Sequence, residues 1–187
     1  MIKNIIAILT TGLAFSPLAH AVEFNHIQTD KSTLGFVYKQ MGVPVDGSFK
    51  KFMAQLNFDP AKLNAAKASL DLDVTSIDTG SDEGNDEVAT KAWFNAKVFP
   101  RAKFESTSFK ALGGNKYEVI GKMSIKGRTQ TVSAPFTLNQ QGSGAIVGGT
   151  FVLKRADFAI GEGAWSDFGT VANEIQIKFH FIATAAK

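Results

Sequence analysis

The residues that could carry acid–base or metal chemistry are few and poorly spaced for it. Beyond residue 21 only His26 and His180 remain as histidines, and no histidine pair has the spacing of a metal site. The chain has no cysteine, which excludes disulfides, thiol nucleophiles and thiolate-bound metals. It also has no G-x-S-x-G elbow and no glycine loop that would hold a phosphate before a helix.

Asp71 and Asp73 come nearest to an acid–base pair. In "KASLDLDVTSI", residues 67–77, they alternate with Leu70 and Leu72, which is the pattern of a strand with one dry and one wet face. Both carboxylates are then expected to face water, where nothing need perturb their pKa values. We therefore predict that the protein is not an enzyme and has no catalytic residues, metal site or cofactor.

Aromatic residues are the more informative feature. Residues 91–106, "KAWFNAKVFPRAKFES", hold Trp93, Phe94, Phe99 and Phe104, and 15 of the 16 phenylalanines lie after residue 21. Phenylalanine has no hydrogen-bonding group, which suits the wall of an apolar pocket. A tightly packed core would also be rich in phenylalanine, so composition alone leaves pocket and packed core open.

Period-two alternation predicts the elements that must position these rings. Eight half-buried antiparallel strands are expected, at residues 33–40, 49–58, 67–77, 103–111, 116–125, 129–138, 145–154 and 174–183. Short glycine-containing links between several of them are typical of hairpins. Ser81 is expected to cap one short helix with carboxylates in its first turns, and Pro100 is expected to end that helical segment at Phe99.

Eight antiparallel strands and one helix form either a sandwich or a closed barrel, and closure removes the exposed edges. We predict an all-β fold with one short helix, in the form of an eight-stranded antiparallel β-barrel. A barrel of this size is filled by its own side chains or holds one small ligand.

The first residues predict export. Lys3, an apolar run from Ile5 to Phe15 and the small-residue pattern Ala19-His20-Ala21 are typical of a secretory signal peptide. The run is shorter than the roughly 20 residues of a membrane-spanning helix, which argues against the alternative of an uncleaved anchor. We predict a signal peptide at 1–21, cleavage after Ala21, one mature domain at 22–187, and location in the periplasm with secretion as the alternative.

Charge excludes nucleic acid as a partner. Without Lys3 the chain has 19 basic and 17 acidic residues, too even a balance for a protein that must neutralise phosphates. Acidic residues gather at 71–87 and basic ones at 97–128. This separation of charges indicates either two solvated faces of opposite sign or, as the functional alternative, a basic rim. The rim would include Arg101, Lys103 and Arg155 and make transient contact with a membrane surface.

Four segments of the chain carry a resemblance to a known family. They are the aromatic stretch with Trp93-Phe94, Phe99-Pro100 and Phe104-Glu105-Ser106, then "GVPVDGSFKKF" (42–52), "GKMSIKGRT" (121–129) and "LKRADFAI" (153–160). In this order they resemble the YceI-like, lipid-binding family, although Ala159 stands where the family usually has glycine and Trp93 where phenylalanine is commoner. The resemblance implies an exported, lipocalin-like barrel with a helix at its opening, which holds a polyisoprenoid, an isoprenoid quinone or a similar lipid.

The predicted ligand-binding residues are apolar or aromatic side chains expected at the tunnel wall or its mouth. They are Phe36, Tyr38, Phe52, Leu70, Leu72, Val74, Phe94, Phe104, Val119, Met123, Val132, Phe136, Phe158 and Trp165. Phe158 and Trp165 belong to the glycine-rich segment 155–173, which is either a movable lid or a floppy surface loop. Trp93 and Phe99 either fasten the helix over the barrel end or contact the ligand.

These observations predict a binding protein for a lipid or isoprenoid ligand, used in transport or storage. The alternatives are a scavenger of hydrophobic toxicants or antibiotics and a packed-barrel surface interaction module. A homodimer is compatible with the sequence.

Overall fold

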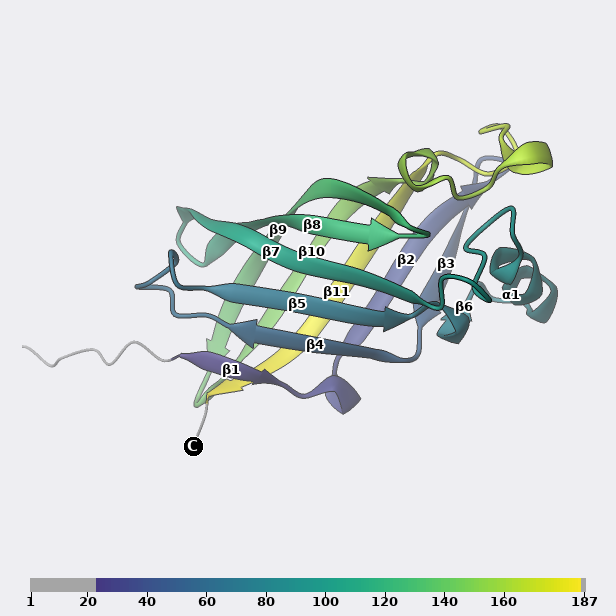
Figure 1. The fold of residues 1–187 in the computed structure, drawn as a ribbon. Coiled ribbons are helices and arrows are strands. Elements are labelled where there is room, and N and C mark those ends of the chain that lie inside the picture. The colour runs from purple at the N-terminus through teal and green to yellow at the C-terminus, as the bar shows by residue number, and fades with distance from the viewer. Residues whose placement is uncertain (1–22, 186–187) are drawn as a thin grey trace, which may run out of the picture.

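Residues 23–185 are described by the computed structural model as one curled antiparallel sheet of eleven strands with one α-helix (Figure 1). The strands are β1 (Phe24–Ile27), β2 (Thr33–Gln40), β3 (Val43–Phe49), β4 (Phe52–Asn57), β5 (Lys67–Asp73), β6 (Ile77–Asp78), β7 (Arg101–Gly113), β8 (Lys116–Ile125), β9 (Arg128–Gln141), β10 (Gly144–Lys154) and β11 (Glu174–Ala185). The helix is α1 (Asp82–Ala89), and four 3-10 turns are η1 (Thr29–Lys31), η2 (Val74–Ser76), η3 (Arg155–Phe158) and η4 (Gly163–Trp165). The predicted signal peptide lies outside the described residues.

Two short strands join the edges of the sheet into a barrel. The order across the sheet is β4-β5-β7-β8-β9-β10-β11-β2-β3-β6. At one end β1 pairs with β11, and Phe24 exchanges two backbone hydrogen bonds with Phe58, just beyond β4, at 3.0 and 2.9 Å. At the other end β5 continues through η2 into β6, which pairs with β3. In Figure 1, β1 lies at one end of the barrel, with α1 and the segment 155–173 at the opposite end.

The predicted all-β antiparallel fold with one short helix is confirmed, but the strand number of eight is wrong. The pattern missed β1, β3 and β6. The first and last of these have only four and two residues, too few for alternation to show. β3 contains Pro44 and Gly47, which are typical of turns. Because β6 pairs with β3 only at Ser48 and Phe49, Pro44 lies where β3 is an edge strand, and edge strands tolerate proline.

The buried faces of the long strands follow the predicted alternation. On β8 the buried residues are Tyr117, Val119, Gly121, Met123 and Ile125. On β11 His180 is exposed, while Phe179 and Phe181 on either side of it are half-buried. Turn chemistry also agrees, since the β8–β9 hairpin has Lys126 and Gly127 at φ values of 49° and 73°.

The capped helix is confirmed, whereas its predicted end is wrong. The Ser81 hydroxyl accepts a hydrogen bond from the Gly84 N–H at 3.1 Å, and α1 begins at Asp82. It stops at Ala89, ten residues before Phe99, and the chain continues in turns that include Asn95 at a φ of 50°. Pro100 therefore marks the entry into β7 rather than the end of the helix.

Candidate ligand-binding site

The barrel encloses a cavity of about 620 Å³. Its wall is made by inward-facing residues of the long strands, with α1 and the segment 155–173 at one end, and it is mostly apolar. One water occupies about 30 Å³ in the liquid, so the cavity offers space for about twenty non-hydrogen atoms. It is therefore large enough for a substantial piece of an apolar chain.

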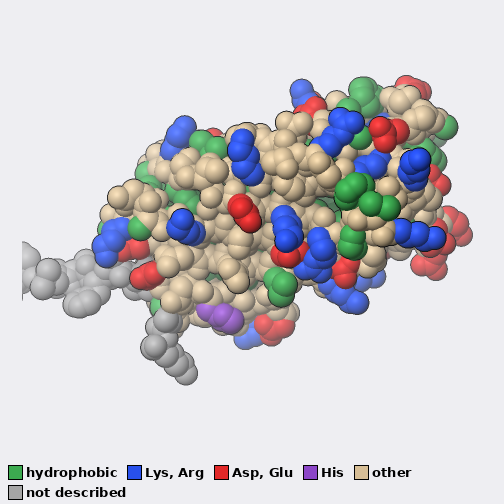
Figure 2. All heavy atoms as spheres, in the orientation of Figure 1, with side chains coloured by type: hydrophobic (Ala, Val, Ile, Leu, Met, Phe, Trp, Pro, Cys, Tyr) green, Lys and Arg blue, Asp and Glu red, His purple; other side chains and the backbone are tan. Residues whose placement is uncertain are grey.

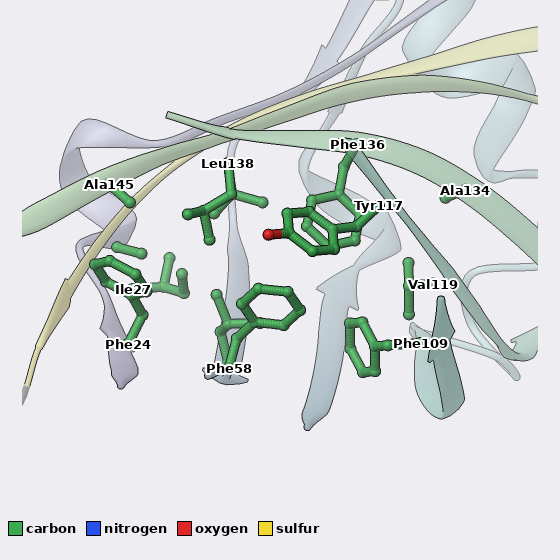
Figure 3. Close-up of a cluster of buried hydrophobic side chains, with 13 residues drawn as sticks. Phe24, Ile27, Phe58, Phe109, Tyr117, Val119, Ala134, Phe136, Leu138 and Ala145 are labelled. Carbon is green, nitrogen blue, oxygen red and sulfur yellow. The ribbon is translucent and has the colours of Figure 1, made fainter. Parts of the chain in front are cut away.

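The end of the cavity near β1 is closed by an aromatic floor, which consists of Phe58, Phe109, Tyr117 and Phe136 (Figure 3). Phe109 and Phe136 line the cavity, and Phe58 and Tyr117 pack behind them. Phe58 is 0% exposed, and its ring centroid lies 5.0 Å from Tyr117, 5.5 Å from Phe109 and 5.6 Å from Phe136. Tilted and edge-to-face rings at these separations add to the stability that their burial provides. This end offers a ligand hydrocarbon contact with almost no hydrogen-bonding partner.

The opposite end is polar, and we call it the mouth. Its lining residues are Tyr38, Gln40, Thr79, Ser81, Glu83 and Glu87. Ser81 and Glu83 are exposed, so the lining reaches the surface beside α1. Polar residues also appear in the lining at Gln55, Ser69 and Lys103, which alternate with the inward Ala54, Leu70 and Phe104 on β4, β5 and β7. The cavity is thus apolar toward the floor and polar at the mouth.

Hydrogen bonds fix the shape of the mouth. The Tyr38 hydroxyl donates to the Thr79 carbonyl at 3.3 Å, and burial raises the pKa of the Tyr38 phenol. The backbone N–H and the hydroxyl of Thr79 both donate to Asn85 Oδ1, at 2.7 and 2.9 Å. A Cβ at Gly84 would overlap the Thr79 hydroxyl, so glycine is required for this close approach of α1.

The aromatic stretch at 91–106 contributes both to the packing of the helix and to the cavity wall. Trp93, Phe94 and Phe104 line the cavity, and the Trp93 indole N–H donates to Glu87 Oε1 at 3.1 Å. Phe99 instead lies against Gly127 in the β8–β9 turn and is not part of the lining. Trp93, only 7% exposed, therefore both ties α1 to the barrel and contributes to the wall.

A buried arginine organises the segment 155–173 over the same end. Arg155 is 1% exposed, and all five of its N–H groups donate to backbone carbonyls. Nε donates to Ala172, Nη1 to Ile160 and Gly161, and Nη2 to Trp165 and Val171, at 2.7 to 3.2 Å. The guanidinium carbon lies 5.4 Å from the centre of the Trp93 ring and 5.0 Å from that of Phe168. Burial lowers the pKa of Arg155, and Asp167 acts in the opposite direction.

Steric constraints and hydrogen bonds shape this segment, for which the sequence alone is compatible with either a movable lid or a floppy surface loop. Gly161 has a φ of 78°, and an added Cβ would overlap Arg155 Nη1. Gly163 also has a positive φ, of 65°. These glycines are needed for backbone conformation and, at Gly161, for room around the guanidinium. With Arg155 at its centre, the segment is a hydrogen-bonded cap, and it contributes Arg155, Ile160, Trp165 and Val171 to the cavity wall.

Most of the predicted ligand-binding residues meet at this cavity. Eleven of the fourteen line it: Phe36, Tyr38, Leu70, Leu72, Phe94, Phe104, Val119, Met123, Val132, Phe136 and Trp165. Glycines opposite two of these rings make room for them, because a Cβ at Gly47 would overlap Phe36 and one at Gly121 would overlap Phe104. Contact between these residues and a ligand remains a prediction.

Three predicted residues are buried but do not line the cavity, and their assignment to the wall is corrected. Phe52 is 8% exposed, with its ring 5.7 Å from that of Phe181. Val74 begins η2, where the chain leaves the extended conformation and the alternation of β5 no longer applies. Phe158 ends η3 and is 1% exposed within the packed core.

Sequence reasoning also missed part of the wall. Phe179 and Phe181 of β11 and Phe151 of β10 line the cavity, as do Val88 of α1 and Leu34 of β2. The alternation of β11 signals the first two, since Ile175, Ile177, Phe179 and Phe181 share one face. Nothing in the sequence indicates that α1 contributes a wall residue, because that depends on how the helix lies across the barrel end.

The predicted basic rim does not form as expected. Arg155 is buried, and both Arg101 and Lys103 lie beside Asp71, with Arg101 Nε 2.6 Å and Lys103 Nζ 3.9 Å from its carboxylate oxygens. In Figure 2, Lys and Arg are spread along the visible face, whereas acidic side chains gather at the end that carries α1. The mouth is thus more acidic than the sequence indicated.

The carboxylates considered for catalysis have structural partners. Asp71 pairs with Arg101, as above, and Asp73 accepts hydrogen bonds from the hydroxyl and the N–H of Thr75 at 2.6 and 3.0 Å. These bonds lower the pKa of Asp73. Between residues 23 and 185 no three His, Asp or Glu side chains are close enough to hold a metal ion. In the same range no helix has the length and apolar character to cross a membrane.

Together, the fold and the site define a class of protein: an antiparallel β-barrel with an internal apolar cavity, an aromatic floor and a polar, helix-flanked mouth. The particular family follows from direct comparison. The chain belongs to the YceI-like domain family, whose model matches residues 26–183, and the resemblance noted in the sequence is confirmed.

Relatives of known sequence or structure match nearly the whole chain. A UPF0312 protein of Pseudomonas putida is 30% identical over 177 residues, covering 89% of this chain and 92% of its own. The crystal structure of Burkholderia cenocepacia BcnA is 46% identical, with a TM-score of 0.82 over 85% of this chain and 100% of its own. A polyisoprenoid binding domain from Saccharophagus degradans shares the fold, with a TM-score of 0.67 at 14% identity, over 88% and 99% of the two chains.

Proposed function

We propose that this protein is an exported binding protein that holds a long apolar amphiphile in its barrel for transport or storage. The ligand class that fits is a polyisoprenoid, an isoprenoid quinone or a similar lipid. The observation that carries the proposal is the cavity of about 620 Å³, which runs from an aromatic floor to a polar mouth. A related fold that is itself a polyisoprenoid binding domain supports this choice of ligand class.

A packed-barrel interaction module fits the structure less well. Such a module would fill its interior with side chains, as small barrels commonly do. Here glycines at positions 47 and 121 leave room for Phe36 and Phe104, and space remains between the opposing walls.

The energetics suit a carrier. Burying a methylene from water contributes about 0.8 kcal/mol, so twenty carbons would nominally approach the roughly 18 kcal/mol at which affinities saturate. The appropriate reference is a membrane, in which the ligand chain is already out of water. The free energy of moving the ligand from membrane to protein is then close to zero, so that the ligand leaves as well as enters. Brief contact of the mouth with a bilayer is part of the proposal.

The test is to identify what the protein carries. Protein purified from its native cells without detergent is extracted with organic solvent, and the extract is analysed by mass spectrometry. We expect a prenyl lipid or isoprenoid quinone in near-stoichiometric amount. Cell fractionation and N-terminal sequencing of the same material test export, for which we expect periplasmic protein beginning at Val22.

A matched pair of variants distinguishes a lipid in the cavity from one adsorbed on the surface. Val132→Trp places a large side chain into the cavity wall, whereas Ser133→Trp places it on the exposed neighbour on the same strand. The first variant should lose the lipid and the second should retain it, with both folded by circular dichroism. Equal loading of both folded variants, or an extract without lipid from the unmodified protein, would contradict the proposal.

A further inference from the structure

The polar end of the ligand must meet the charged groups of the mouth, and the cations there have few free hydrogen-bond donors. Arg155 lines the cavity, but its five N–H groups are all donated to backbone carbonyls. A phosphate or carboxylate near it would find a positive charge surrounded by carbonyl oxygens and no free donor. Recognition of such anions relies on paired donors of this kind, which are already used here.

The second cation at this end is occupied in a similar way. Lys126 Nζ donates to the Ala159 carbonyl at 2.6 Å, to Glu162 Oε2 at 2.9 Å and to the Ala92 carbonyl at 3.5 Å. These three contacts account for the three protons of its ammonium group. The side chain is 8% exposed, and Lys126 is not part of the cavity lining.

Lys103 is the other cation in the lining, and it belongs to the outer face of the wall. Its side chain is 58% exposed and lies 3.9 Å from Asp71. On β7 it alternates with Ala102 and Phe104, which face the cavity. Lys91, which follows α1, is exposed and does not line the cavity.

The anions of the mouth, by contrast, remain available. Glu83 and Glu87 of α1 line the cavity. Between residues 23 and 185, neither carboxylate forms an ion pair, and Glu87 accepts one hydrogen bond from the Trp93 indole. An ionised carboxylate has about four acceptor positions, so both can take further hydrogen bonds from a donor.

We propose that the cavity selects amphiphiles by the charge of their polar end: a neutral or cationic hydrogen-bond donor, such as an alcohol, a phenol or an amine, is accepted, and a phosphate or carboxylate is rejected. This inference rests on the proposed function and narrows its ligand class. An alcohol or ammonium group at the mouth donates to Glu83 or Glu87, whereas a phosphate there meets two carboxylates. Of the cations that line the cavity between residues 23 and 185, Arg155 has all its donors in use and Lys103 lies on the outer face beside Asp71. The repulsion between one carboxylate charge and one phosphate charge about 6 Å apart, at an effective dielectric constant between those of a protein surface and water, corresponds to about a tenfold loss of affinity.

The test compares three ligands with the same chain: geranylgeraniol, geranylgeranylamine and geranylgeranyl monophosphate. Their twenty-carbon chain matches the cavity volume. Trp93 and Trp165 are the two tryptophans of the chain, and both line the cavity, so intrinsic fluorescence reports loading. We expect the alcohol and the amine to bind at least tenfold more tightly than the phosphate at neutral pH and low salt.

Two double variants locate the origin of the selectivity. Glu83→Gln with Glu87→Gln removes both charges from the lining while leaving an acceptor for the Trp93 indole. Asp82→Asn with Asp86→Asn removes the same charge from the same helix at positions outside the lining. The glutamine pair should bring the phosphate to within about threefold of the alcohol, and the asparagine pair should leave most of the difference in place.

Each remaining outcome is decisive. If the phosphate binds as tightly as the alcohol, charge selection is refuted while the proposed lipid-binding function stands. If the two double variants change the ratio equally, the effect is that of the overall field of the helix, and the assignment to Glu83 and Glu87 is wrong. If none of the three ligands binds, this inference fails together with the proposed function.

Discussion

Gly161 is the position at which the organisation of the cap is most open to test. An alanine there has to adopt a φ near 78°, at a cost of about 1 to 2 kcal/mol for the left-handed region. Its Cβ would also overlap Arg155 Nη1, so the guanidinium would have to shift away from the carbonyls of Ile160 and Gly161. Hydrogen bonds that involve a charged group contribute about 1.5 to 3 kcal/mol each. The expected loss in the free energy of unfolding is therefore about 4 kcal/mol or more.

Gly163→Ala is the matched control two residues away. Gly163 also has a positive φ, of 65°, but nothing lies within 4 Å of the Cβ that would be added. Its substitution should cost only the backbone strain, about 1 to 2 kcal/mol. Urea unfolding followed by circular dichroism measures both losses, and the difference corresponds to at least about 5 °C in Tm for a chain of this size.

A double-mutant cycle assigns this difference to the arginine. In an Arg155→Met background the guanidinium is gone, so Gly161→Ala should cost no more than Gly163→Ala does. Equal losses for the two alanine variants in the wild-type protein would refute the reasoning, as would an undiminished cost of Gly161→Ala in the Arg155→Met background.

Three further outcomes follow from the site and its ion pairs. Phe136→Ala removes a ring from both the floor and the wall. It should lower the free energy of unfolding by about 3 to 5 kcal/mol and shift the binding preference of the protein toward prenyl alcohols longer than geranylgeraniol. A loss of stability with an unchanged chain-length preference would place Phe136 in the core alone. Trp165→Ala should speed release of a bound isoprenoid to liposomes, measured by stopped-flow fluorescence of Trp93, because it removes the one aromatic ring that the cap contributes to the wall. An unchanged rate would mean that release does not pass the cap. Thr75 lowers the folded-state pKa of Asp73, so the contribution of Asp73 to stability is present above its ordinary pKa of about 3.9 and is lost as the pH falls through the lowered value. Asp73→Asn should therefore be less stable than the wild type at pH 7 and lose less further stability in acid. Identical acid-unfolding profiles of the two proteins would contradict this.

The barrel wall was predictable because it depends on local alternation. Val119 and Met123 on β8, and Leu70 and Leu72 on β5, face inward for the same reason that they were predicted to do so: side chains on a strand point alternately to its two faces. Where the strand ends, the rule ends too, which is why Val74 at the start of η2 was misplaced.

The ends of the barrel were not predictable in the same way. Arg155 appears in the sequence as one more surface charge, and only the folding of residues 160–172 around it supplies the five carbonyls that allow its burial. The same limit applies to β6, whose two residues can be recognised as a strand only by their pairing with β3. Both features depend on contacts between segments that carry no repeating pattern.

The pairing of β1 with β11 has a consequence for the order in which the molecule can form. Phe24 pairs opposite Ala185, so the first strand of the described chain cannot form its ladder until the last one is present. Contacts between residues so distant in sequence carry a high loop-closure entropy and are characteristic of slow-folding β proteins. A chain that is still emerging, and still lacks β11, cannot close the barrel beside Phe58. Completion of the fold is thereby postponed until β11 has been made, and until then the chain stays open beside Phe58.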